Sequence, residues 1–186
     1  MRGAPALPDL EALSELDERL RARPTDARAV RDALARAETA LAAARRGGDR
    51  RAEQRLLGYV GNARRLLGHH EAAVADLRES RRLAERLGDQ RAAVVALARL
   101  GEALRCADRS EEAVRTLRRA EREAAASAAE LRHFALQHLG KALLDAGDDA
   151  GARACLGEAL ALRRARGDAE LVASTEAALR LLPPTQ

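Results

Sequence analysis

The chain has 186 residues, of which 47% are hydrophobic and 33% charged, while only 1% are aromatic. This length allows one domain or a short repeat array, and the balance excludes a disordered chain. Because Ala and Leu are abundant while Ile, Thr, Phe and Tyr are scarce, helix is expected almost everywhere and sheet nowhere. The net charge of +4 arises from 33 basic and 29 acidic residues, so most charge is compensated along helix surfaces.

The sequence has no recognisable targeting or membrane segment. Residues 1–8, expected to be a flexible N-terminus, contain one arginine and no apolar stretch long enough for a signal peptide. No run of about 18 apolar residues occurs anywhere, so no membrane partner is expected. Cys106 and Cys155 lack the short spacing of metal or redox sites. Together these features predict a cytoplasmic protein with free thiols.

The N-terminal part, residues 9–48, is predicted to form two helices. The first, from Asp9 to Arg21, would carry four leucines on one side and cap the repeat stack. Its acidic residues allow an alternative, in which it occupies a basic groove of the same chain: Asp9, Glu11, Glu15, Asp17 and Glu18. The second helix opens at Thr25-Asp26 and runs to about Arg46 as a degenerate half-repeat.

A pattern of small residues and leucines recurs three times between residues 49 and 167. Its members are Gly61, Ala73 and Leu77, then Gly101, Ala113 and Leu117, then Gly140, Ala152 and Leu156. The steps between the first residues of the units are 40 and 39 residues. Each unit is predicted to form two antiparallel helices, which gives six helices at 50–67, 70–87, 90–106, 110–126, 129–145 and 149–166.

The repeated glycines indicate close helix packing. A glycine inside a helix costs about 1 kcal/mol relative to alanine, so its recurrence at one repeat position requires a structural reason. Gly101 is therefore expected at a helix–helix contact, whereas Ala98 is expected on the open side of the same helix. After the third unit, residues 168–182 are predicted to form a C-terminal capping helix that Pro183-Pro184 ends, and residues 183–186 form a tail.

The motif Leu100-Gly101-x-x-Leu104 followed by Ala113-x-x-x-Leu117 resembles the tetratricopeptide repeat. The resemblance spans about residues 50–166, and the long period is similar to the extended variety of that family. It implies an all-α solenoid of antiparallel helix hairpins in a right-handed superhelix. Two features depart from the family pattern: Arg64 replaces an apolar residue in the first unit, and the terminal prolines are missing.

Several clusters of side chains could in principle bind a metal or take part in catalysis, but their places in the predicted helices explain them without such a role. His69-His70-Glu71 at a helix start would point in different directions and lacks a fourth ligand. Paired acids such as Glu111-Glu112 suit the positive end of a helix dipole. Cys106 and His133 have no third group to orient them. We therefore expect no enzyme activity, no catalytic residue, no metal and no cofactor.

The family resemblance implies a concave face lined by the first helix of each unit. Residues projecting there form the predicted partner-binding groove: Arg55, Tyr59, Asn62, Arg65, Arg99, Glu102, Arg105, Phe134, His138 and Lys141. Its cations outnumber its anions, so a non-catalytic scaffold that binds an acidic protein or peptide is expected. Two alternatives stay open, namely a nucleic-acid-binding helical-repeat protein and a self-associating structural subunit of a regulatory complex. Basic runs interleaved with acids and the lack of stacking aromatics disfavour nucleic acid.

Overall fold

A computed structural model describes residues 6–183 of the chain. Within this range eight α-helices follow one another, so the predicted all-helical array is confirmed. Their bounds are α1 Ala27–Gly47, α2 Arg50–Leu66, α3 His70–Arg86, α4 Gln90–Cys106, α5 Ser110–Ser127, α6 Arg132–Asp145, α7 Asp149–Arg166 and α8 Ala169–Arg180. A single 3-10 turn, Ala129–Leu131, precedes α6. The six helices expected from the repeats are present with nearly the expected bounds.

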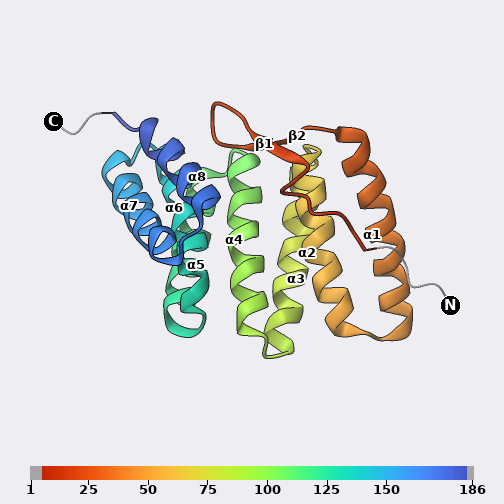
Figure 1. The fold of residues 1–186 in the computed structure, drawn as a ribbon. Coiled ribbons are helices and arrows are strands. Elements are labelled where there is room, and N and C mark those ends of the chain that lie inside the picture. The colour runs from red at the N-terminus through yellow and green to blue at the C-terminus, as the bar shows by residue number, and fades with distance from the viewer. Residues whose placement is uncertain (1–5, 184–186) are drawn as a thin grey trace.

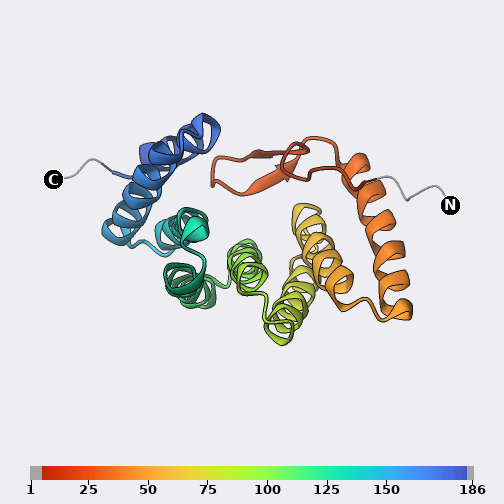
Figure 2. The same ribbon diagram turned by 60° about the horizontal axis from the view of Figure 1, so that its bottom comes forward.

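The helices form a curved row in which each packs against the next in sequence. Figures 1 and 2 show α2, α4 and α6 on one side of the row and α3 and α5 on the other. Contacts between α2 and α4 and between α4 and α6 join successive units. The row ends in α1 on one side and in α7 and α8 on the other. This arrangement is a helical-repeat solenoid, and α2, α4 and α6 line its concave face.

The prediction of a helix from Asp9 to Arg21 is wrong. The chain instead forms an antiparallel hairpin of β1 Ser14–Leu16 and β2 Ala22–Pro24, with Leu16 opposite Ala22. We call residues 9–24 the N-terminal strap. It runs across the concave face between α1 and α8 (Figure 2). The expectation of no sheet therefore fails at this one short hairpin.

Local hydrogen bonding explains why the strap is not a helix. The Asp17 carboxylate accepts hydrogen bonds from the backbone N–H groups of Arg19 and Arg21, at 3.0 and 2.8 Å, and so closes a turn. Within this turn Leu20 has a positive φ of 56°, which a helix does not allow. The leucine spacing that suggested a helix face serves another purpose, because Leu10 and Leu20 are buried.

Helix ends follow the acidic caps in the sequence. Asp49, Asp89, Asp148 and Asp168 precede α2, α4, α7 and α8, and each carboxylate accepts a backbone N–H of the first turn. Such caps satisfy donors that a helix start leaves unpaired. The same cap therefore starts the first helices of two successive units, α2 and α4, whereas α6 begins after the 3-10 turn without a side-chain cap.

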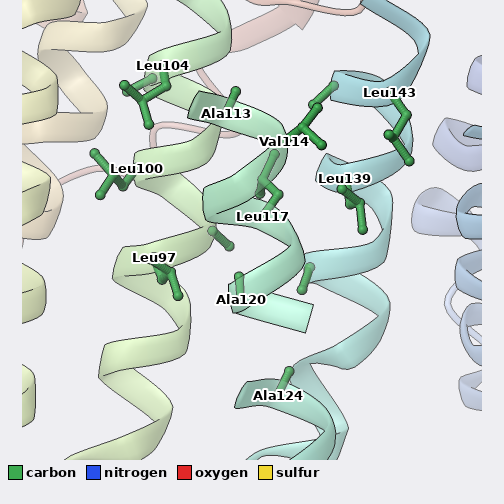
Figure 3. Packing of buried hydrophobic residues seen from close by; sticks show 14 of the residues in the cluster. Leu97, Leu100, Leu104, Ala113, Val114, Leu117, Ala120, Ala124, Leu139 and Leu143 are labelled. Atoms are coloured by element: carbon green, nitrogen blue, oxygen red, sulfur yellow. The ribbon is translucent and has the colours of Figure 1, made fainter. Parts of the chain in front are cut away.

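The repeated glycines pack as the sequence predicts. A Cβ atom added at Gly101 would lie 2.3 Å from Cγ of Leu117, which is fully buried on α5. Figure 3 shows Leu117 on α5, between the ribbons of α4 and α6. Ala98 was expected on the open side but is fully buried, which corrects that assignment. It lies three residues before Gly101 and therefore on nearly the same face of α4.

The structure describes most of the chain but not its two ends. Residues 1–5 and 184–186, which include most of the predicted flexible N-terminus and tail, lie outside the described residues. The carbonyl of Ala6 accepts a hydrogen bond from Arg36 at 2.8 Å, and Leu7 packs near α1 and α2. Over residues 6–183, no helix is both long and apolar enough to cross a membrane.

Candidate functional site

The ten residues of the predicted groove all lie on α2, α4 and α6, but they share no single open surface. The strap covers the part of the concave face near the C-terminal ends of these helices (Figure 1). Nine of the ten residues are buried or half-buried, and Arg55 is exposed. The face therefore divides into a partly enclosed pocket beneath the strap, which we call the enclosed cavity, and a more open groove between α2 and α4.

Arg105 joins the strap to the helices. Its side chain is 1% exposed and donates to the backbone carbonyls of Arg19 and Leu20 at 3.1 and 2.8 Å. It also binds both carboxylate oxygens of Glu102, at 3.0 and 2.8 Å, and Asp145 at 3.0 Å. Five hydrogen bonds around one guanidinium make this a structural centre, because a buried charge is tolerated only when paired.

The charges at this centre support one another. Burial alone would raise the pKa of Glu102, but the charge of Arg105 and hydrogen bonds from His138 and Arg105 hold it well below its ordinary value. Nδ1 of His138 lies 3.1 Å from Glu102, and its ring meets Phe134 edge to face at 4.6 Å. Burial lowers the pKa of His138, although Glu102 opposes the shift. The carboxylate of Glu102 is thus fully engaged within the chain.

Two further groove residues bind parts of their own chain. The hydroxyl of Tyr59 donates to the carbonyl of Pro8 at 2.8 Å and so holds the residue that directly precedes the strap. Asn62 accepts from Nε and Nη2 of Arg65, at 3.1 and 2.8 Å. The remaining nitrogen of Arg65, Nη1, is buried without a hydrogen-bond partner among residues 6–183. The predicted role of these residues in partner binding stays a prediction.

The enclosed cavity has a volume of about 420 Å³. The strap, α2, α4, α6, α7 and α8 all contribute to its wall. Volumes of about 300–1,000 Å³ are typical of small-molecule sites. The wall is mixed in character, with apolar residues Leu10, Leu66, Phe134 and Leu171 beside charged ones.

Four cations of the cavity wall make no ion pair within the described part of the chain: Arg65, Arg99, Lys141 and Arg163. Arg163 is 2% exposed and donates to three groups that carry no negative charge, the carbonyl of Leu171 at 3.0 Å, the hydroxyl of Thr175 at 2.7 Å and Nδ1 of His133 at 3.4 Å. Burial lowers its pKa to about 10 and that of Lys141 to about 8. The side chain of Arg99 forms no hydrogen bond within residues 6–183. Burial lowers the pKa of Arg99 as well.

The acids of the cavity are placed differently from its cations. Glu102 is buried but neutralised by Arg105, whereas Glu11, Glu15 and Glu170 are exposed. The interior is therefore positive, and the negative side chains lie at the rim. Gln137 adds an unusual feature, because it is 3% exposed and both polar atoms of its amide lack a partner in the described chain.

The open groove lies between α2 and α4 and has a volume of about 370 Å³. Arg55 is exposed on its α2 side, and Arg99, which also borders the enclosed cavity, stands on its α4 side. Half-buried Val95 contributes to its floor. Gly58 keeps the groove open, since a Cβ there would lie 3.3 Å from the Ser80 hydroxyl and 4.0 Å from Nη1 of Arg99.

Sequence reasoning missed Arg163, Gln137 and the strap. Gln137 directly precedes the predicted His138, so the helical pattern that indicated His138 could also have indicated Gln137. Arg163 belongs to a second helix, which the family resemblance assigns to the convex side, and α8 turns it toward the cavity. No sequence signal indicated the strap as a wall, because its leucine pattern is typical of a helix.

Other candidates do not form sites. In the described range no group of three or more His, Cys, Asp or Glu side chains could hold a metal ion. Cys106 is buried, Cys155 is half-buried, and both are free thiols. Burial raises the pKa of each thiol, so neither has the character of an activated nucleophile.

The fold and its concave face define a helical-repeat protein with a self-covered groove. Neither the models of known protein families nor the curated protein sequences give a match to this chain.

Proposed function

We propose that this chain is a non-catalytic scaffold of the tetratricopeptide type that binds an acidic segment of a partner protein in the open groove. The observation that carries the proposal is the pairing of Arg55 and Arg99 on opposite sides of the Val95 floor. Within residues 6–183 neither arginine forms an ion pair. Guanidinium groups bind carboxylates with two parallel hydrogen bonds, and a concave wall strengthens their field.

The chemistry of the floor suggests what accompanies the acid. Ala92, Ala96 and Val95 offer apolar surface between the two arginines, and Leu131 closes one end. A peptide with an aliphatic residue beside its carboxylates would match this order of groups. Arg91 at the edge is already paired with Glu130, so it contributes less. The two free thiols favour a reducing compartment such as the cytoplasm.

Selection from a library of random peptides would supply a ligand and test the proposal together. The selected peptides should be rich in Asp and Glu with interspersed aliphatic residues. Fluorescence anisotropy would then compare the unmodified chain with a variant carrying Arg55→Glu and Arg99→Glu, which should bind more than tenfold more weakly because two charge-assisted contacts become repulsive. Circular dichroism must first show that the variant is folded.

Arg118→Glu with Arg122→Glu is the matched control. Both arginines are exposed on α5 and form no ion pair among residues 6–183, whereas Arg119 binds Glu123 at 2.7 Å and would confound the comparison. The control should bind the selected peptide like the unmodified chain. Equal loss in both variants, or selection of peptides without acids, would refute the proposed groove.

A further inference from the structure

We infer that the enclosed cavity beneath the strap is a binding site for a small organic anion, with the anionic head held by Arg65, Arg99 and Lys141 and the apolar body against Leu66 and Phe134. This site is separate from the partner groove proposed above, although Arg99 borders both. A ligand here would be enclosed by helices and strap together.

The first argument is the imbalance of buried charge. Four cations line the wall, and none of them is paired with a carboxylate in the described residues. Glu102 is the one buried acid of the wall, and Arg105 and His138 already occupy it. Clustered cations of low solvent exposure are costly unless an anion neutralises them. An anionic head group would remove that cost.

The second argument is unused hydrogen-bonding capacity. Nη1 of Arg65 and both amide atoms of Gln137 are buried without a partner in residues 6–183. Buried polar atoms in folded proteins are paired in the great majority of cases, so the orphaned amide of Gln137 in a wall residue of this cavity points to a ligand. Arg65 adds less to this argument, because its side chain also lies beside the Cys106 thiol.

The residues of the wall other than the cations indicate the chemistry of the ligand beyond its anionic head. Leu10, Leu66, Phe134 and Leu171 offer apolar contact, while exposed Glu11, Glu15 and Glu170 lie at the rim. The rim acids would repel a second negative charge. The ligand therefore carries one anionic head, carboxylate or phosphate, with an apolar body and no acid at its outer end.

Three probes of similar shape test the inference on the complete chain: 3-phenylpropionate, phenyl phosphate and neutral 3-phenylpropionamide. Isothermal titration calorimetry should detect at least one of the two anions, and the amide should bind at least about tenfold more weakly. The stronger anion identifies the head group. Failure of both anions to bind, or equal binding of the amide, would overturn the inference.

Two variants locate the site. Arg99→Met and Lys141→Met keep the apolar stems but remove the charges, so each should weaken anion binding about tenfold or more. Neither should lower the melting temperature of the free protein, because each removes a buried charge without an ionic partner. A merely structural role would predict a lower melting temperature instead. Arg118→Met on α5 is the control and should bind the anion normally.

The outcome also separates this site from the partner groove. Arg55→Glu, which alters only the open groove, should leave anion binding unchanged. Loss of anion binding in Arg55→Glu, or full binding in both methionine variants, would contradict the assignment to the enclosed cavity. If either methionine variant fails to fold, the comparison of anions with the amide on the unmodified chain still decides the matter.

Discussion

Replacing Gly101 by alanine should destabilise the protein, although alanine is the better helix former. The new Cβ would lie 2.3 Å from Cγ and 2.6 Å from Cδ2 of Leu117, distances that require one of the groups to move. Leu117 is fully buried between α4 and α6 and cannot withdraw freely (Figure 3). Overpacking of this kind costs about 1–3 kcal/mol, whereas the gain in helix propensity is about 1 kcal/mol. We therefore expect a net loss of up to about 2 kcal/mol in the free energy of unfolding.

Gly157→Ala is the matched control for this substitution. Gly157 is also inside a helix, but a Cβ at that position would have no neighbour within 4 Å. Alanine should therefore stabilise α7 by about 0.5–1 kcal/mol. Urea unfolding followed by circular dichroism measures the free energy of unfolding of both variants. A thermal melt is a second measure, in which a change of 1 kcal/mol corresponds to about 2–4 °C in melting temperature for a chain of this size.

A double-mutant cycle tests the contact itself. Leu117→Ala alone should cost about 2–5 kcal/mol by leaving a cavity. In combination with Gly101→Ala, the loss should be smaller than the sum of the two, because the added methyl group no longer meets Leu117. If Gly101→Ala is as stabilising as Gly157→Ala, or if the two losses simply add, the packing argument is refuted.

Three further predictions concern buried groups. Lys141→Met should be more stable than the unmodified chain by up to about 3 kcal/mol below pH 8, and this advantage should shrink toward pH 10.5. The reason is that between these pH values the folded chain releases its Lys141 proton while the unfolded chain still holds it. Urea denaturation at a series of pH values measures the difference in the free energy of unfolding. Arg105→Met should lose about 3–5 kcal/mol in thermal or urea unfolding, since it leaves Glu102 buried without its partner, and a loss below 1 kcal/mol would contradict the central role of this residue. Thiol titration should find two reactive groups, Cys106 and Cys155, after denaturation without reductant, and buried Cys106 should react slowly in the native chain; a titre of zero would indicate a disulfide.

The sequence was sufficient for the repeats because their signals are local and agree with one another. Gly101 and Leu117 belong to a spacing that recurs in each unit, and capping residues such as Asp89 mark the helix starts. Ala98 was misassigned because small residues line both the helix contacts and the interfaces between units. Ala98 is fully buried because it lies three residues before Gly101, on nearly the same face of α4.

The strap could not be predicted because its structure depends on distant residues. Leucines at 10, 13, 16 and 20 are typical of an amphipathic helix, yet Leu20 adopts a positive φ while its carbonyl accepts hydrogen bonds from Arg105. Tertiary contacts outweigh local propensity here. For the same reason the sequence placed the ten groove residues on the concave helices α2, α4 and α6 but did not reveal that the strap divides this surface. Arg105 was expected to meet a partner, and it meets the strap of its own chain.

The strap changes how this chain is expected to fold. Repeat arrays contact only neighbouring units, so their folding can begin in any unit and spread outward. Arg105 instead binds residues 19 and 20, which precede it by 86 and 85 positions, and Asp145, which follows it by 40. During synthesis the strap emerges first, yet its binding surface is complete only after α6 has formed. Because docking closes such long loops, it should come late and slowly, and afterwards the units should unfold together rather than one by one.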